Sequence, residues 1–274
     1  MCPAPRALRA AGLGLATLIA LGAAAMAQTR PTVLQLEDRP SSAIYLDEGL
    51  YFQSFRDADG LAAQVTSLLL GGGARQAFRA APVTLSAGHL HWHDPVGYAL
   101  ARSGPAFVRG FAAQDWRPFD IAILTDCGEC PDEPRAKGAW LERSRRDAAA
   151  VRRHGGQPVL FMPWAERDRP EAIRRIAEVT TQAANASGAF VIPAGLAFAK
   201  ARDQRPGLVL HADQLRPNRA GTYLAAVVTY AVLFGVSPVG NRATADLDAE
   251  TALFLQRVAW ETAWTYFAGQ PPPE

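Results

Sequence analysis

The chain has 274 residues, with 28 basic and 26 acidic side chains, and its formal net charge at pH 7 is +2. This near balance argues against electrostatic binding to nucleic acid. The length, with 49% hydrophobic residues, suits one α/β domain with a sizeable core.

The first 27 residues have the pattern of a cleaved secretory signal. Arg6 and Arg9 precede a short apolar run, and Ala25-Met26-Ala27 forms a small-residue cleavage motif. An N-terminal membrane anchor is the alternative, but the run is short and rich in Ala and Gly. We therefore expect export to the periplasm or the medium, no membrane attachment after cleavage, and a single domain over 28–274. Removing both arginines from 28 basic residues leaves 26, which equals the number of acidic residues.

The remaining chain alternates strand-like and helix-like segments. Short apolar runs bounded by loops predict strands at 31–36, 42–46, 119–126, 158–164 and 189–195. Segments of helical period, most of them ended by glycine, predict helices at 57–73, 140–156, 168–188, 219–235 and 249–269. Such alternation predicts an α/β fold: a three-layer α/β/α, flavodoxin-like sandwich around a parallel sheet of about five strands.

The helix expected at 168–188 carries the clearest terminal signals. Asp168 stands at the N-cap position, Pro170 lies in the first turn and Glu171 completes a capping box. Gly188 marks its carboxyl end.

Two cysteines, Cys127 and Cys130, remain after signal cleavage and form a C-G-E-C pair. Oxidation to a local disulfide is favoured in an exported protein. A redox or metal-binding pair is typically followed by a helix, whereas Pro-Asp-Glu-Pro follows here at once. Free thiols are the remaining alternative.

Four blocks between about residues 116 and 238 resemble the SGNH (GDSL-type) hydrolase superfamily in order and spacing. They are FDIAILTD, GGQPVLFMPWA, FVIPAGLAFAKA and HADQLRPNRAGTYLAAVVTYAVLFGVSP. The last block resembles the terminal catalytic block and its following helix. The resemblance implies ester hydrolysis by a Ser-His-Asp arrangement, with a small-molecule or carbohydrate acyl ester as substrate and no cofactor.

The resemblance also implies roles for individual positions. Ser54, in Phe52-Gln53-Ser54-Phe55, matches the nucleophile of a G-N-S-F block, and Asp213 matches the residue that orients the base. Gly88 matches an oxyanion glycine. Thr125 follows the third strand, where the family has an amide side chain, and its hydroxyl could donate a hydrogen bond instead.

Three positions depart from the family pattern. Phe52 replaces the glycine of the nucleophile block, and Thr125-Asp126 replaces the amide. Arg216 occupies the position of the catalytic histidine, and a guanidinium stays protonated and cannot act as a general base. His211, in the same loop, is a candidate substitute base, or a residue of that loop without a catalytic role.

Other side chains suggest binding. His89, His91 and His93 share one face of an extended segment and could hold a metal with Asp94 or Asp126, contact substrate, or simply hydrogen-bond to neighbours. Trp164 follows a predicted strand, where it could stack on a sugar or belong to the core.

Three hypotheses follow. The chain is an exported esterase using Ser54 with a non-standard base, or a degenerate domain that binds a ligand, such as a glycan, with Arg216 holding an anionic group. The third is a metal-binding periplasmic protein built on His89, His91 and His93. The sequence does not predict an oligomeric state.

Overall fold

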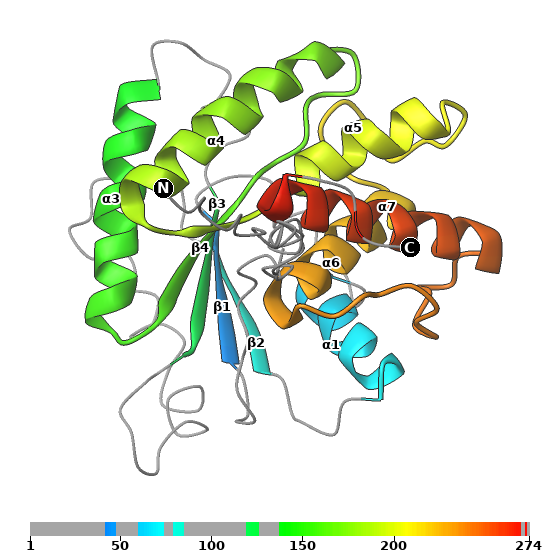
Figure 1. Ribbon diagram of the computed structural model, residues 1–274, viewed down its shortest axis with the longest axis horizontal. Helices are drawn as coiled ribbons and strands as arrows, with labels where there is room; N and C mark the ends of the chain where they lie inside the picture. The colour runs from blue at the N-terminus through cyan, green and yellow to red at the C-terminus, as the bar shows by residue number, and fades with distance from the viewer. Residues whose placement is uncertain are drawn as a thin grey trace, which may run out of the picture. The chain divides into compact units, whose positions relative to one another are not determined.

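Figure 1 shows the computed structural model, which describes residues 42–47, 60–73, 79–84, 119–125, 137–269 and 272. They all belong to one compact unit, Pro31–Glu274. For residues 42–47 and 79–84, only the backbone is described. The strand predicted at 31–36 lies outside these residues.

Five parallel strands form one sheet in the order β2-β1-β3-β4-β5. Their bounds are β1 Ser42–Asp47, β2 Arg79–Thr84, β3 Ile121–Thr125, β4 Gln157–Phe161 and β5 Phe190–Ile192. The chain first moves from β1 to one edge at β2 and then returns to place β3 on the other side of β1. The parallel sheet confirms the sequence prediction; four of its five described strands were predicted, and β2 was not.

Helices cover both faces of this sheet, so the predicted three layers are confirmed. They are α1 Leu61–Gly71, α3 Lys137–Arg153, η3 Pro170–Ala172, α4 Ile173–Ser187, α5 Ala194–Gln204, α6 Arg219–Phe234 and α7 Ala249–Ala268. Figure 1 shows α3 and α4 on one side of the strands, and α1 and α6 on the other. None of the described helices combines the length and apolar character needed to span a membrane.

Side chains on the two faces of each central strand pack into separate hydrophobic cores. On β3, Ile121 and Ile123 pack with the core of α1, α5, α6 and α7, whereas Ala122 and Leu124 pack with that of α3 and α4. This follows from the period of two along a strand. Because both faces are covered, the strands read as continuous apolar runs, which made them visible in the sequence.

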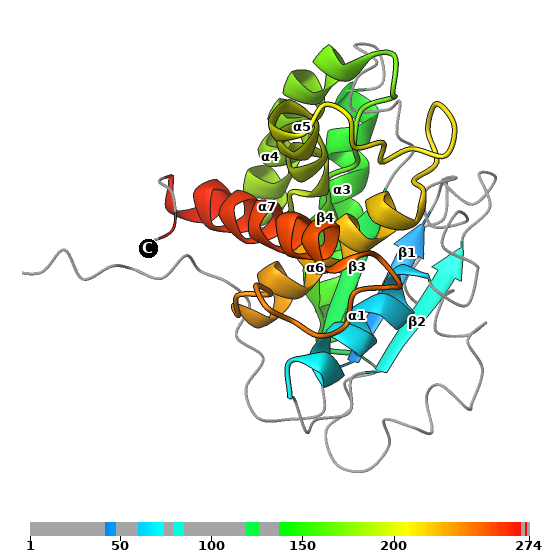
Figure 2. The ribbon, with the colours of Figure 1, turned by 90° about the vertical axis from the view of Figure 1, so that its right-hand side faces the viewer.

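Helix α6 is buried without interruption from Ala220 to Leu233. It packs against α1, α5 and α7, and Figure 2 shows α7 crossing it. The Asn218 side chain caps it by accepting a hydrogen bond from Gly221 N at 3.0 Å. Gly235 ends the helix in the left-handed region, at φ 63°.

The capping box predicted at Asp168 is wrong. The chain enters through the 3₁₀ turn Pro170–Ala172, and α4 begins only at Ile173, without a side-chain cap. A residue that precedes proline avoids the helical region, and Arg169 has φ −123° and ψ 52°. Asp168 therefore lies too far from the first helical turn to cap it. Gly188 ends the helix at φ 62°, as predicted.

The strand predicted at 189–195 is shorter than expected. Pro193 cannot donate to a ladder, so β5 ends at Ile192 and α5 begins at Ala194. This helix was not predicted. The strand predicted at 158–164 likewise ends at Phe161, and Met162 continues with a backbone hydrogen bond to Ile192 O at 2.9 Å.

Two glycines in the first turns of helices should respond oppositely to alanine. A Cβ at Gly221 would lie 2.2 Å from Leu210 O, so Gly221→Ala should destabilise the fold by about 1–3 kcal/mol. At Gly138 no atom of the described residues lies within 4 Å of the added Cβ, so Gly138→Ala should stabilise the fold by up to about 1 kcal/mol. Urea unfolding of both variants measures the difference, and equal effects would contradict the close approach of α6 to Leu210.

Candidate functional site

The segment from Leu210 to Asn218 connects α5 to α6 by folding back on itself. His211 and Pro217 form an antiparallel bridge, and Ala212 N donates to Arg216 O at 2.8 Å. Asn218 N donates to Leu210 O at 2.9 Å, which closes the base of the loop. Asp213 and Arg216 therefore lie at the tip, held by backbone hydrogen bonds.

The Asp213 carboxylate is bound within its own loop. It accepts hydrogen bonds from Leu215 N at 2.9 Å, from Arg216 N at 2.6 Å and from Arg216 Nε. The backbone and side chain of Arg216, and then Leu215 N, lower the pKa of Asp213 from 3.8 to about 2. The carboxylate is therefore ionised at any working pH and orients Arg216.

The Arg216 side chain is 66% exposed and forms an ion pair with Asp213 through Nε. Its terminal nitrogens have no partner among the residues that the structure describes. The group cannot accept a proton, but its outer edge can donate to a ligand.

The His211 ring contacts Ala165 and Phe198. Its Nε2 lies 3.2 Å from Ala165 O, and its ring packs edge-on against Phe198 with centroids 5.6 Å apart. Because a carbonyl only accepts, Nε2 carries a hydrogen. Burial is the main cause that lowers the pKa of His211, and the nearby cations Arg167 and Arg202 lower it further.

Trp164 is a core residue, and the proposed sugar platform is wrong for this side chain. It is 1% exposed, its Nε1 donates to Leu215 O at 2.8 Å, and one face stacks on Phe198 at 4.4 Å. Phe161 meets it edge-on at 6.2 Å. No face is left for a ligand.

Thr125 is the last residue of β3 and is buried at the carboxyl end of the sheet. Ligands bind at this end in open parallel sheets. The other predicted site residues lie outside the described part of the chain: Ser54, Gly88, His89, His91, His93, Cys127 and Cys130. Among the described residues, no group of three His, Cys, Asp or Glu side chains could hold a metal.

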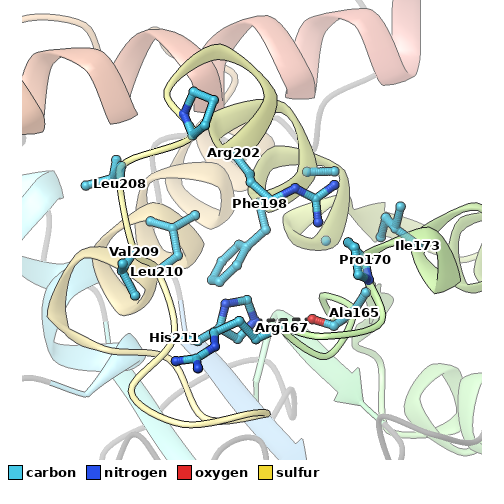
Figure 3. A pocket seen from close by; sticks show the side chains of 13 residues that line it. Ala165, Arg167, Pro170, Ile173, Phe198, Arg202, Leu208, Val209, Leu210 and His211 are labelled. Atoms are coloured by element: carbon cyan, nitrogen blue, oxygen red, sulfur yellow. Dashed lines mark hydrogen bonds between the residues drawn. The ribbon is translucent and has the colours of Figure 1, made fainter.

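A pocket lies beside His211, between α5 and the loops that follow β4 and α5 (Figure 3). Two arginines, Arg167 and Arg202, line it with His211 and Phe198. Neither arginine was predicted from the sequence to be a site residue. Placing Ala194–Gln204 in a helix would have set Phe198 and Arg202 one turn apart, on the same face.

No protein-family model and no curated protein matches the sequence. Solved structures match the fold. A DUF4886 family protein from Bacteroides uniformis has a TM-score of 0.56 at 13% identity, covering 80% of this chain and 93% of its own. A protein from Slackia heliotrinireducens assigned to the SGNH hydrolases has a TM-score of 0.50 at 21% identity, covering 71% and 100%. An acetyl xylan esterase variant from Geobacillus stearothermophilus has 0.52 at 10%, covering 72% and 95%.

The chain has an SGNH hydrolase-like fold. This confirms the fold that the resemblance implied. Within this SGNH hydrolase-like fold, Arg216 stands three residues after Asp213, where the resemblance places the catalytic histidine. A shared fold does not supply a shared reaction, so the chemistry has to follow from these side chains.

The ion pair at the loop tip predicts a specific pH dependence. Because folding lowers the pKa of Asp213, the carboxylate stabilises the fold fully above pH 3.8, and this contribution is lost as the pH falls toward about 2. Wild type should therefore unfold at a higher temperature than Asp213→Ala at neutral pH, and the gap should shrink in acid. Circular dichroism melting at a series of pH values measures it. A gap that stays constant between about pH 5 and about pH 3 would contradict the ion pair.

Proposed function

We propose that this SGNH hydrolase-like chain is a degenerate domain that binds a ligand without hydrolysing it. The observation that carries the proposal is the Asp213–Arg216 ion pair. In a Ser-His-Asp arrangement the carboxylate holds an imidazole that takes the proton of the serine. Here the carboxylate holds a guanidinium, which has no proton-accepting form at working pH.

His211 is a poor substitute for that base. The Nε2–H is committed to Ala165 O, and the ring packs against Phe198. The Asp213 oxygens are committed to Leu215 N and to Arg216. Among the described residues, no carboxylate hydrogen-bonds to the His211 ring, and burial lowers the pKa of the ring, which disfavours the protonated form that acyl transfer requires.

The proposed ligand is a carbohydrate that carries a carboxylate. The exposed Arg216 keeps its terminal nitrogens for a partner, and a planar guanidinium edge matches a carboxylate with two parallel hydrogen bonds. The likeness in fold to an acetyl xylan esterase supports a carbohydrate as the ligand class.

Hydrolysis of p-nitrophenyl acetate by wild type and by Ser54→Ala tests the loss of catalysis. We expect the two rates to agree within about twofold, because a nucleophile without its base contributes little. A rate for wild type well above that for Ser54→Ala would overturn the proposal. It would favour instead an esterase that uses Ser54 with a base at another position. Arg216→His, assayed beside the Arg216→His and Ser54→Ala double variant, shows whether the remaining site is intact.

Binding of the protein to an array of uronic-acid-containing and neutral oligosaccharides tests the ligand class. Arg216→Gln should abolish binding of the acidic oligosaccharides. Arg153→Gln removes the same charge from an exposed position at the end of α3 and should leave binding unchanged. Equal binding by wild type and Arg216→Gln would reject Arg216 as the ligand contact.

We also propose that the chain is exported and cleaved after Ala27. The charged start, the short apolar run and the Ala25-Met26-Ala27 motif support this. The intact mass of protein from a periplasmic or secreted fraction should correspond to a chain that begins at Gln28. A mass that includes residues 1–27 would contradict cleavage.

A further inference from the structure

The pocket beside His211 has a volume of about 220 Å³. Its walls come from the loop after β4, the start of α4, α5 and residues 206–211, and they are mostly apolar. The apolar lining includes Ile173, Phe198, Leu208 and Leu210. An apolar cavity of about 150 Å³ is enough to bind benzene, so this pocket has room for a molecule of one-ring size.

The charges at this pocket are all of one sign. Arg167 and Arg202 line it, and no Asp or Glu is among its lining residues. Figure 3 shows Arg167 beside His211 and Arg202 on the other side of the Phe198 ring. Both cations also act on the His211 ring, where they lower the pKa of the imidazole.

Neither guanidinium is strongly neutralised by the protein. The Arg167 side chain has no ion pair among the described residues. Arg202 pairs with the adjacent Asp203 at 3.4 Å, and both side chains are exposed, so that pair is weak. A positive potential next to an apolar cavity favours an anion whose body is apolar.

We propose that this pocket binds a small organic carboxylate with an apolar body of about one ring, either aromatic or branched aliphatic. The body displaces water from Phe198 and the neighbouring leucines, and the carboxylate lies at the arginines. His211 does not hold the anion, because its Nε2–H is given to Ala165 O and its other nitrogen carries a lone pair. Asp213 and Arg216 do not line the pocket, so this site is separate from the proposed carbohydrate contact.

Calorimetric titration with benzoate, benzamide and acetate separates the two parts of this recognition. Benzoate should bind best, since benzamide keeps the ring without the charge and acetate keeps the charge without the ring. The benzoate affinity should fall as salt is raised, because the arginines are exposed. Equal affinities for benzoate and benzamide, or no binding of benzoate, would overturn the proposal.

Substitutions locate the site. Arg167→Gln and Arg202→Gln should each weaken benzoate binding by about fivefold to tenfold and reduce the preference over benzamide. Arg153→Gln removes a remote charge and should have no effect. Arg216→Gln should also leave benzoate binding unchanged, so failure here is distinguishable from failure of the carbohydrate proposal. Melting curves check that each variant is folded, and unchanged binding in both pocket variants would reject the site.

Discussion

The hydrogen bond from Trp164 Nε1 to Leu215 O, at 2.8 Å, fixes the loop on which both candidate sites depend. The indole is buried after β4 and stacks on Phe198 of α5, and Phe198 in turn packs on His211. A buried N–H without an acceptor is costly, so the Leu215 carbonyl cannot move far from the ring. The loop that carries Asp213 and Arg216 is thereby held against this stack, and Phe198 and His211 of the same stack line the cationic pocket.

The architecture could be predicted because its signals are local. Buried parallel strands are short apolar runs, and α6 and α7 end at Gly235 and Gly269 in left-handed conformations that glycine adopts readily. The predicted helix and strand bounds were wrong where one residue or element restricts the conformation of the next. The start of α4 is set by the restriction that Pro170 places on Arg169, which overrode the polar signal of Asp168. Helix α5 follows β5 so closely that its first turn was read as the end of the strand.

The candidate site was predictable to the extent that it lies in one segment. The family resemblance places Arg216 where the proton acceptor is expected, three residues after Asp213, and the structure adds that the two side chains bind each other. Arg167 and Arg202 were not found, because they come from different elements and become neighbours only through the packing around Phe198. The sequence left Trp164 as either a ligand platform or a core residue, because an indole after a strand has the same sequence signature whether it faces the core or the solvent.

The uninterrupted burial of α6, from Ala220 to Leu233, bears on how relatives of this chain should be compared. Nearly every side chain there meets packed atoms, so a polar or larger replacement would destabilise the domain whatever ligand it binds. This packing constraint acts on the interior of the domain and does not depend on any reaction. Sequence similarity along α6 thus measures shared packing, and the enzymatic capacity of a relative is better judged from the loop tip that precedes it.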